Sequence, residues 1–159
     1  MIYVTLGTQN RDFSRPLKEI DRLIDKGIIK DEIYVQAGST KYHSDKMNIF
    51  TEIANKDYID YMKRCNLLIT HGGIGSITDG LKYNKKIIVI PRLKKYDEHV
   101  NDHQLDIVNA FYNKGLIEKV IEMDELEDVI KNISNFKPAN YVKDNKKMLK
   151  IISNYIDNN

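Results

Sequence analysis

The sequence predicts an α/β fold, in which helices cover both faces of a doubly wound parallel sheet. Short apolar runs rich in β-branched residues alternate with segments whose apolar residues recur at helical spacing. The runs LLIT at 67–70 and IIVI at 87–90 are hydrophobic throughout, which is typical of parallel strands buried on both faces. No repeat or interdomain linker interrupts residues 1–159, so we expect one domain.

The expected elements alternate between strand and helix along the chain. Strands are expected at Ile2–Leu6, Glu32–Gln36, Leu67–Thr70 and Ile87–Ile90, with weaker candidates in MNIFTEI near residue 50 and LIEKVI near residue 118. Helices are expected at Ser14–Lys26, Ile74–Tyr83, Asn101–Asn113, Asp124–Ile133 and Tyr141–Ile156. Pro138 precedes the last of these helices and marks it as a separate element.

Composition argues against several classes of protein. The formal net charge of +2 does not favour a nucleic-acid partner. Cys65 is the sole cysteine, so no internal disulfide is expected and a reducing, cytoplasmic setting is favoured. We expect neither a signal peptide nor a transmembrane segment, because no apolar run approaches the ~20 residues that span a bilayer.

Residues 71–76 read HGGIGS and lie between an expected strand and an expected helix. Turns at the carboxyl ends of strands are where open α/β sheets bind ligands. Glycine lets the backbone bend sharply and lets a ligand approach its N–H groups. The following helix adds unpaired donors and the positive end of its dipole. These properties suit a phosphate group, to which His71 and Ser76 could each add a donor.

Asp79 follows Ser76 by one helical turn and therefore shares its face of the helix. A carboxylate at this distance from a phosphate site lies where a ribose diol would be, and it can accept hydrogen bonds from both hydroxyls. Ser76 and Asp79 also fit a capping box, which would only close the helix, and glycines in such a turn can serve packing alone. The sequence lacks a dinucleotide-binding GxGxxG and a Walker loop, which leaves a phosphate turn of another kind.

A second polar cluster follows the next strand, where residues 91–104 read PRLKKYDEHVNDHQ. Two polar loops at one edge of a parallel sheet form a pocket, although this one could equally be a solvated surface with Asp102 as a helix cap. The pair His99 and His103 loosely fits an inverted zinc-protease motif, but the glutamate and a third ligand are missing. We therefore expect no metal here.

HGGIGSITDGL, KKIIVIPR and EHVNDHQ together resemble the C-terminal, nucleotide-sugar-binding half of GT-B glycosyltransferases, namely the family 28 C-terminal domain. The chain is most similar to small donor-binding subunits of two-part enzymes. These include bacterial capsule and exopolysaccharide glycosyltransferases and the dolichol-linked N-acetylglucosaminyltransferase. MIYVTLGTQNRDF at the start and YIDYM at 58–62 extend the resemblance over nearly the whole chain. It implies a Rossmann-like sheet that forms a single half of a GT-B fold.

The resemblance also implies roles for individual residues. The diphosphate is implied to lie against two glycine turns, at Gly7, Thr8, His71, Gly73, Gly75 and Ser76. Asp79 matches the residue that binds the ribose hydroxyls, and Ile59 matches the position whose backbone contacts uracil. Gln104, with Asp102 or His103 beside it, matches the polar pair that reads the donor sugar. No cofactor or catalytic metal is implied, because the UDP-sugar is a substrate.

The implied function is that of a donor-binding subunit of a UDP-sugar-dependent glycosyltransferase, which extends a lipid-linked saccharide in capsule or exopolysaccharide synthesis. The acceptor site and general base are expected on a membrane-associated partner, so the chain alone is expected to be inactive or weak. The partner would hold this cytoplasmic chain at the inner face of the membrane. The alternative is a non-catalytic stimulatory or nucleotide-sugar-sensing module.

The expected helix at 141–156 carries an apolar stripe with lysines mostly beside it. Such a stripe can pack on its own domain. In the GT-B resemblance a last helix crosses between the two halves, so docking on the partner is the other expectation for this helix.

Overall fold

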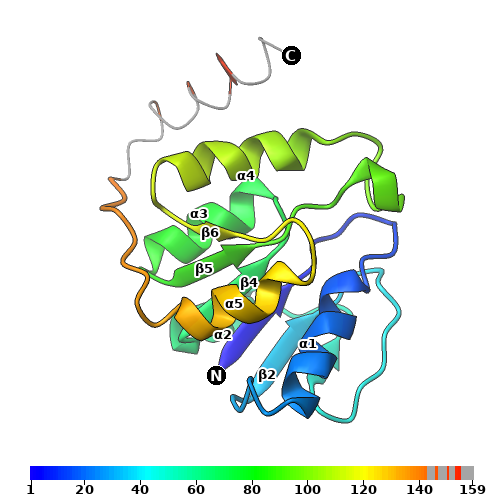
Figure 1. Ribbon diagram of the computed structural model, residues 1–159. Helices are drawn as coiled ribbons and strands as arrows, with labels where there is room; N and C mark the ends of the chain where they lie inside the picture. The colour runs from blue at the N-terminus through cyan, green and yellow to red at the C-terminus, as the bar shows by residue number, and fades with distance from the viewer. Residues whose placement is uncertain (143–145, 147–149, 151–152, 155–159) are drawn as a thin grey trace.

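The computed structural model describes residues 1–142, 146, 150, 153 and 154. In this part of the chain, six parallel strands form one sheet with helices on both faces (Figure 1). The strands are β1 (Ile2–Thr5), β2 (Ile33–Gln36), β3 (Asn48–Phe50), β4 (Leu67–Thr70), β5 (Lys86–Val89) and β6 (Glu118–Lys119). The helices are α1 (Arg15–Asp25), α2 (Asn55–Arg64), α3 (Ile74–Lys82), the short 3-10 helix η1 (Lys94–Tyr96), α4 (His103–Asn113) and α5 (Glu125–Asn132).

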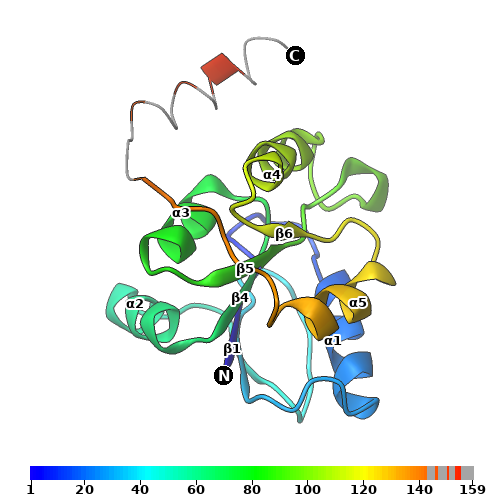
Figure 2. The same cartoon turned by 60° about the vertical axis from the view of Figure 1, so that its left-hand side comes forward.

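The strand order across the sheet is β3-β2-β1-β4-β5-β6. The chain starts in the middle, moves outward to β3, and then returns to β4. From β4 it moves outward on the other side of the sheet, through β5 to β6 (Figure 2). β1 and β4 are therefore neighbours, with Thr5 beside Thr70. In open α/β sheets the crevice at such a switch of direction is where ligands bind. The predicted Rossmann-like, doubly wound parallel sheet is confirmed.

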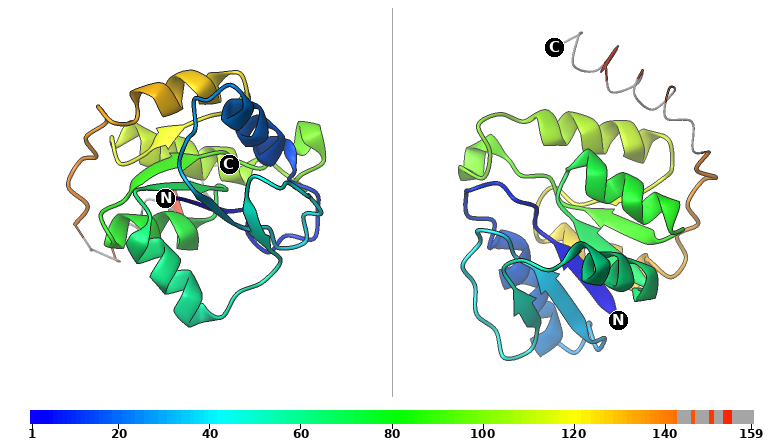
Figure 3. Two further views of the ribbon diagram at one scale, coloured as in Figure 1. Left: turned by 90° about the horizontal axis from the view of Figure 1, so that it is seen from below. Right: turned by 180° about the vertical axis from the view of Figure 1, so that it is seen from behind.

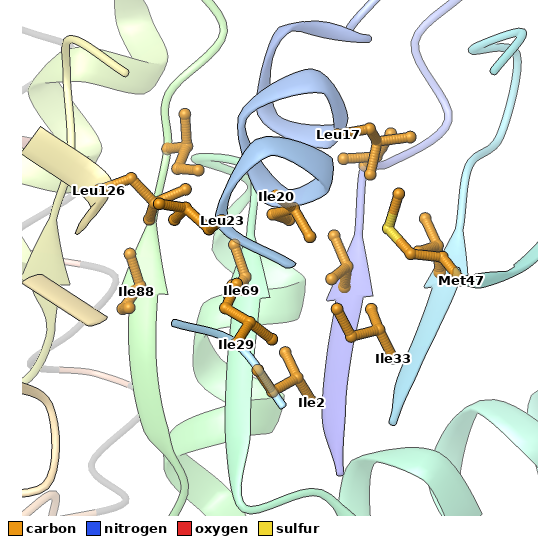
Figure 4. Close-up of a cluster of buried hydrophobic side chains, with 14 of the residues drawn as sticks. Ile2, Leu17, Ile20, Leu23, Ile29, Ile33, Met47, Ile69, Ile88 and Leu126 are labelled. Atoms are coloured by element: carbon orange, nitrogen blue, oxygen red, sulfur yellow. The ribbon is translucent and has the colours of Figure 1, made fainter. Parts of the chain in front are cut away.

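Alternate residues of each strand face opposite sides of the sheet, and both sides are covered. On one side, Val4 and Ile69 pack with residues of α1 and α5, as the close-up in Figure 4 shows for Ile69, Ile20 and Leu126. On the other side, Tyr3 and Leu68 pack with residues of α2, α3 and α4, which lie in front in the right-hand view of Figure 3. Burial on both faces explains why LLIT is hydrophobic without alternation.

The expected strands and helices up to residue 133 are confirmed to within two residues at each end, and the weaker candidates are confirmed as β3 and β6. Helix α2 is an element that the sequence pattern did not indicate. The helix expected at 141–156 falls mainly outside the described residues. Before it, the amide of Ala139 donates to the carbonyl of Gly115, and Tyr141 packs partly buried against the second core cluster. No helix in the described part of the chain has the length and hydrophobicity that crossing a bilayer requires.

Candidate functional site

Two glycine turns meet at the switch point between β1 and β4. Gly7 follows β1 with a φ of +77°, a conformation that glycine adopts readily. His71 follows β4, and a Cβ built on Gly7 would lie 2.6 Å from its Nε2 atom. A Cβ on Gly73 would come closer still to the same atom. The structure thus brings Gly7, His71 and Gly73 together, and only glycine fits on either side of the imidazole.

The N-terminus of α3 presents free backbone donors beside these turns. The first amide of the helix region to find a backbone acceptor is that of Ile77, which donates to the carbonyl of Gly73. Among the described residues, the amides of Ile74, Gly75 and Ser76 have no acceptor, and Gly73 provides no side-chain cap. Apart from the two neighbouring residues and the backbone of α3 itself, no atom of the described residues lies within 4 Å of a Cβ built on Gly75. This arrangement suits an anion, because the donors and the positive end of the helix dipole face open space.

The side chain of His71, beside the N-terminus of α3, is neutral near pH 7. Burial, with a smaller contribution from the positive charge of Arg92, lowers the pKa of His71 to about 4. The Nδ1 atom lies 3.3 Å from the Thr70 hydroxyl and 3.4 Å from the Thr5 carbonyl oxygen. An anion bound here would therefore be held by hydrogen bonds from neutral groups, and the imidazole would add no positive charge near neutral pH.

Asp79 lies one turn further along α3 and is held by Tyr58 of α2. The Tyr58 hydroxyl donates to Oδ2 of Asp79 at 3.1 Å. Burial raises the pKa of Tyr58, and the carboxylate beside it adds to the rise, so this hydroxyl stays protonated as a donor. No partner of Oδ1 is found among the described residues, which leaves that oxygen able to accept from a ligand hydroxyl. Tyr58 is a functional candidate that the sequence reasoning missed.

Ile59 lies inside α2, one residue after Tyr58. Its backbone N–H and C=O are within a continuous helix and are directed along the helix axis. The backbone N–H and C=O of Ile59, which were expected to contact uracil, are therefore engaged in the hydrogen bonds of the helix. The amides of Asn55, Lys56 and Asp57, in the first turn of α2, are the helix donors without intrahelical acceptors, because the amide of Tyr58 is the first to find one.

Gln104 joins the two polar loops that were expected to lie side by side. Its Oε1 atom accepts from the amide of Gly72 and from the amide of Arg92, both at 3.0 Å. The side chain is 7% exposed. Its oxygen is thus committed to the protein, and the amide nitrogen is the group left for a ligand. Asp102 accepts from the amide of Lys94 at 2.8 Å, and His103 is exposed beside it.

Arg92, which belongs to the second polar cluster, is fully buried. Its guanidinium donates to the carbonyls of Leu6 at 2.8 Å, Arg11 at 3.0 Å and Glu98 at 3.3 Å. The guanidinium carbon also lies 4.6 Å from the centre of the Phe13 ring. Arg92 therefore fastens the segment after β1 to the segment after β5.

A wide cleft of about 1090 Å³ opens on the other side of the first glycine turn. Asn10 and the segments 37–44 and 47–51 line it. A Cβ on Gly38 would overlap the carbonyl oxygen of Gly7, so the wall of this cleft packs directly on the first glycine turn. The described residues contain no cluster of histidine, cysteine and carboxylate side chains that could hold a metal ion.

The sheet order, the glycine turns at the switch point and the free α3 donors define a Rossmann-like domain with a candidate anion-binding site at the carboxyl ends of its strands. The chain belongs to the glycosyltransferase family 28 C-terminal domain family, whose model matches residues 1–158.

Two curated relatives carry the name UDP-N-acetylglucosamine transferase subunit ALG13. The protein from Candida albicans is 33% identical over 81 residues, which are 51% of this chain and 26% of the relative. The protein from Debaryomyces hansenii is 27% identical over 111 residues, which are 67% of this chain and 50% of the relative. The chain thus spans half or less of the length of these relatives. An NMR solution structure of ALG13 matches the fold with a TM-score of 0.61 and 18% identity, over 95% of this chain and 94% of that one.

Proposed function

We propose that this chain is the donor-binding subunit of a UDP-sugar-dependent glycosyltransferase. The observation that carries the proposal is the switch point itself. The open amides of α3 stand beside a neutral His71 that two glycines enclose, with the Asp79 carboxylate one turn further on. This spacing fits a diphosphate followed by a ribose, and membership of the family supports a sugar nucleotide as the ligand.

In glycosyl transfer, an acceptor hydroxyl attacks the anomeric carbon while the bond to the diphosphate oxygen breaks. The free amides of α3 would stabilise the negative charge that builds on the departing diphosphate. Asp79 would hold the ribose through Oδ1, while Tyr58 occupies Oδ2. The amide nitrogen of Gln104 would face the donor sugar. We assign no general base to this chain, and we propose that a partner subunit supplies the base and the acceptor site.

We further propose that the partner is membrane-associated, that the acceptor is a lipid-linked saccharide of capsule or exopolysaccharide synthesis, and that the complex works at the cytoplasmic face. Both relatives are named as subunits of a transferase, which supports a two-part enzyme. Assays with a panel of UDP-sugars identify the donor sugar of this chain.

Calorimetry with UDP tests the site directly. We expect Asp79→Ala to lose about 1.5–3 kcal/mol of binding free energy, because a charge-assisted hydrogen bond disappears. Asp128→Ala is the matched control, since Asp128 lies in the first turn of α5 on the opposite face of the sheet. Equal affinity of the two variants would remove Asp79 from the site, and preference for NAD over UDP would refute the proposed ligand.

Activity is then measured on membranes, with this chain expressed with and without the product of its neighbouring gene. Transfer that needs both chains supports the subunit proposal. UDP-sugar binding without transfer under any condition would support the sensing or stimulatory alternative. A chain that ends at Val142 keeps Ala139 and Tyr141 packed on the domain. We expect it to fold and bind UDP but to fail in assembly, if residues 143–159 contact the partner.

A further inference from the structure

Two buried hydroxyls stand behind His71, at the carboxyl ends of the two central strands. Thr5 and Thr70 are register partners of β1 and β4, and their Oγ1 atoms are 2.8 Å apart. Their exposed fractions are 1% and 2%, so no bulk water satisfies these groups. Thr70 also lies 3.3 Å from Nδ1 of His71. The three side chains thus form a short row from Thr5 through Thr70 to the imidazole.

The hydroxyl protons in this row fix the direction of its hydrogen bonds. Each hydroxyl carries one proton, and one of the two must donate to the other. If Thr70 donates to Thr5, the proton of Thr5 has no acceptor among the described residues, because the Thr70 hydroxyl is the one partner found for the Thr5 hydroxyl there. If Thr5 donates to Thr70, the proton of Thr70 reaches Nδ1 of His71. Only the second arrangement satisfies both buried protons, which buried polar groups generally require.

The remaining contact of Nδ1 fits the same arrangement. The carbonyl oxygen of Thr5, 3.4 Å from Nδ1, already accepts from the backbone amide of His71 at 3.2 Å. That oxygen therefore does not depend on a proton from the ring. A neutral imidazole that accepts at Nδ1 carries its proton on Nε2. Nε2 is the atom that faces the two glycine turns at Gly7 and Gly73.

We propose that Thr70 is a positioning residue, which fixes His71 in the Nε2–H tautomer so that a neutral imidazole donates to an oxyanion between the two glycine turns. The identity of that oxyanion as a diphosphate oxygen rests on the proposed function. Arg92 and His99 are the charged or titratable groups whose fields reach His71, and both disfavour a second proton on the ring. The donor is thus available without protonation of the imidazole.

Long-range ¹H–¹⁵N NMR of the full chain, labelled with ¹⁵N-histidine and without ligand at pH 7, reports the tautomer. The chain has four histidines, and loss of one signal set in His71→Asn assigns the resonances. We expect Nε2–H in the wild type and in Thr70→Ser, which keeps the hydroxyl. Thr5→Val is expected to keep it too, because Thr70 can still donate to Nδ1. Thr70→Val, which is nearly isosteric, is expected to shift the ring toward Nδ1–H.

An Nδ1–H tautomer in the wild type, or an unchanged tautomer in Thr70→Val, would overturn the proposal. Thr70→Ala repeats the measurement with a smaller side chain if the valine variant is unfolded. UDP titrations form the second arm, with an expected loss of about tenfold in Thr70→Val and little change in Thr70→Ser. A changed tautomer with unchanged UDP affinity would refute the donor role. Failure of the wild type to bind UDP would refute the proposed function, while the NMR result would still decide the tautomer.

Discussion

Replacing Gln104 with methionine tests how the two loops of the site are held together. Methionine is similar in length and apolar, so it keeps most of the packing but offers no oxygen to the amides of Gly72 and Arg92. A buried donor without an acceptor costs about 1–3 kcal/mol, so the two amides together predict a loss of about 2–6 kcal/mol. Because whole domains are stable by only about 5–15 kcal/mol, this loss is large.

Equilibrium unfolding in urea, followed by circular dichroism, measures the loss as a lower midpoint. Gln104→Glu is the matched variant, because a carboxylate oxygen can accept from both amides but cannot donate as the amide nitrogen does. We expect it to stay within about 1 kcal/mol of the wild type in stability. We expect the wild type to bind a UDP-sugar more tightly than UDP. Gln104→Glu is expected to bind the two ligands equally, because it lacks the amide nitrogen that donates to the sugar. An unchanged midpoint in Gln104→Met would refute the reasoning, and equal destabilisation of both variants would show that the oxygen is not what matters.

Three further predictions follow from single groups. Unfolded histidine titrates near 6.5 whereas burial holds the pKa of His71 at about 4, so the unfolded state binds more protons between these values. The free energy of unfolding, measured in urea at several pH values, is therefore expected to rise from pH 4 to 6.5 by up to about 1.4 kcal/mol per unit, and His71→Asn to flatten the rise. Tyr58→Phe removes the donor to Asp79. We expect calorimetry to show that the affinity for UDP falls by about threefold to tenfold, and that the affinity for 2′-deoxy-UDP falls by less. An equal fall for both ligands would contradict this prediction. Transferase activity of the assembled enzyme is expected to survive EDTA, because backbone amides meet the phosphate charge; abolition with rescue by a divalent ion would contradict it.

The sequence predicts the sheet and the glycine turn well because both depend on local patterns. LLIT must be hydrophobic throughout to be buried on both faces, and the turn needs glycine where His71 packs. Helix α2 could not be predicted in this way, because it packs on the sheet through aromatic rings and not through a stripe of aliphatic residues. The Tyr61 ring lies 4.8 Å from that of Tyr34 and 5.4 Å from that of Tyr3, between ring centroids. These partners come from β1 and β2, so no local spacing reveals them.

The roles of Arg92 and Gln104 depend on distances between segments far apart in the chain. An arginine beside two lysines has the pattern of a solvated loop, yet the carbonyls that it needs come from Leu6 and Arg11. Likewise, Gln104 can be placed near the site from its position at a helix start, but its oxygen is assigned only once the amide of Gly72 is seen beside it. Tertiary proximity, which the sequence does not display, decides both cases.

The buried guanidinium of Arg92 has a consequence for how a two-part enzyme would close around its substrates. One side chain holds carbonyls from the segments after β1 and after β5, so we expect the two walls of the proposed donor site to move together. If either wall moved separately, the buried guanidinium of Arg92 would lose some of its hydrogen-bond acceptors, which is energetically costly. Water would then be excluded from the reaction by rotation of the whole domain against its partner. In such an enzyme the hinge is the interface between two chains, and the strength of their association would set the rate of opening and product release.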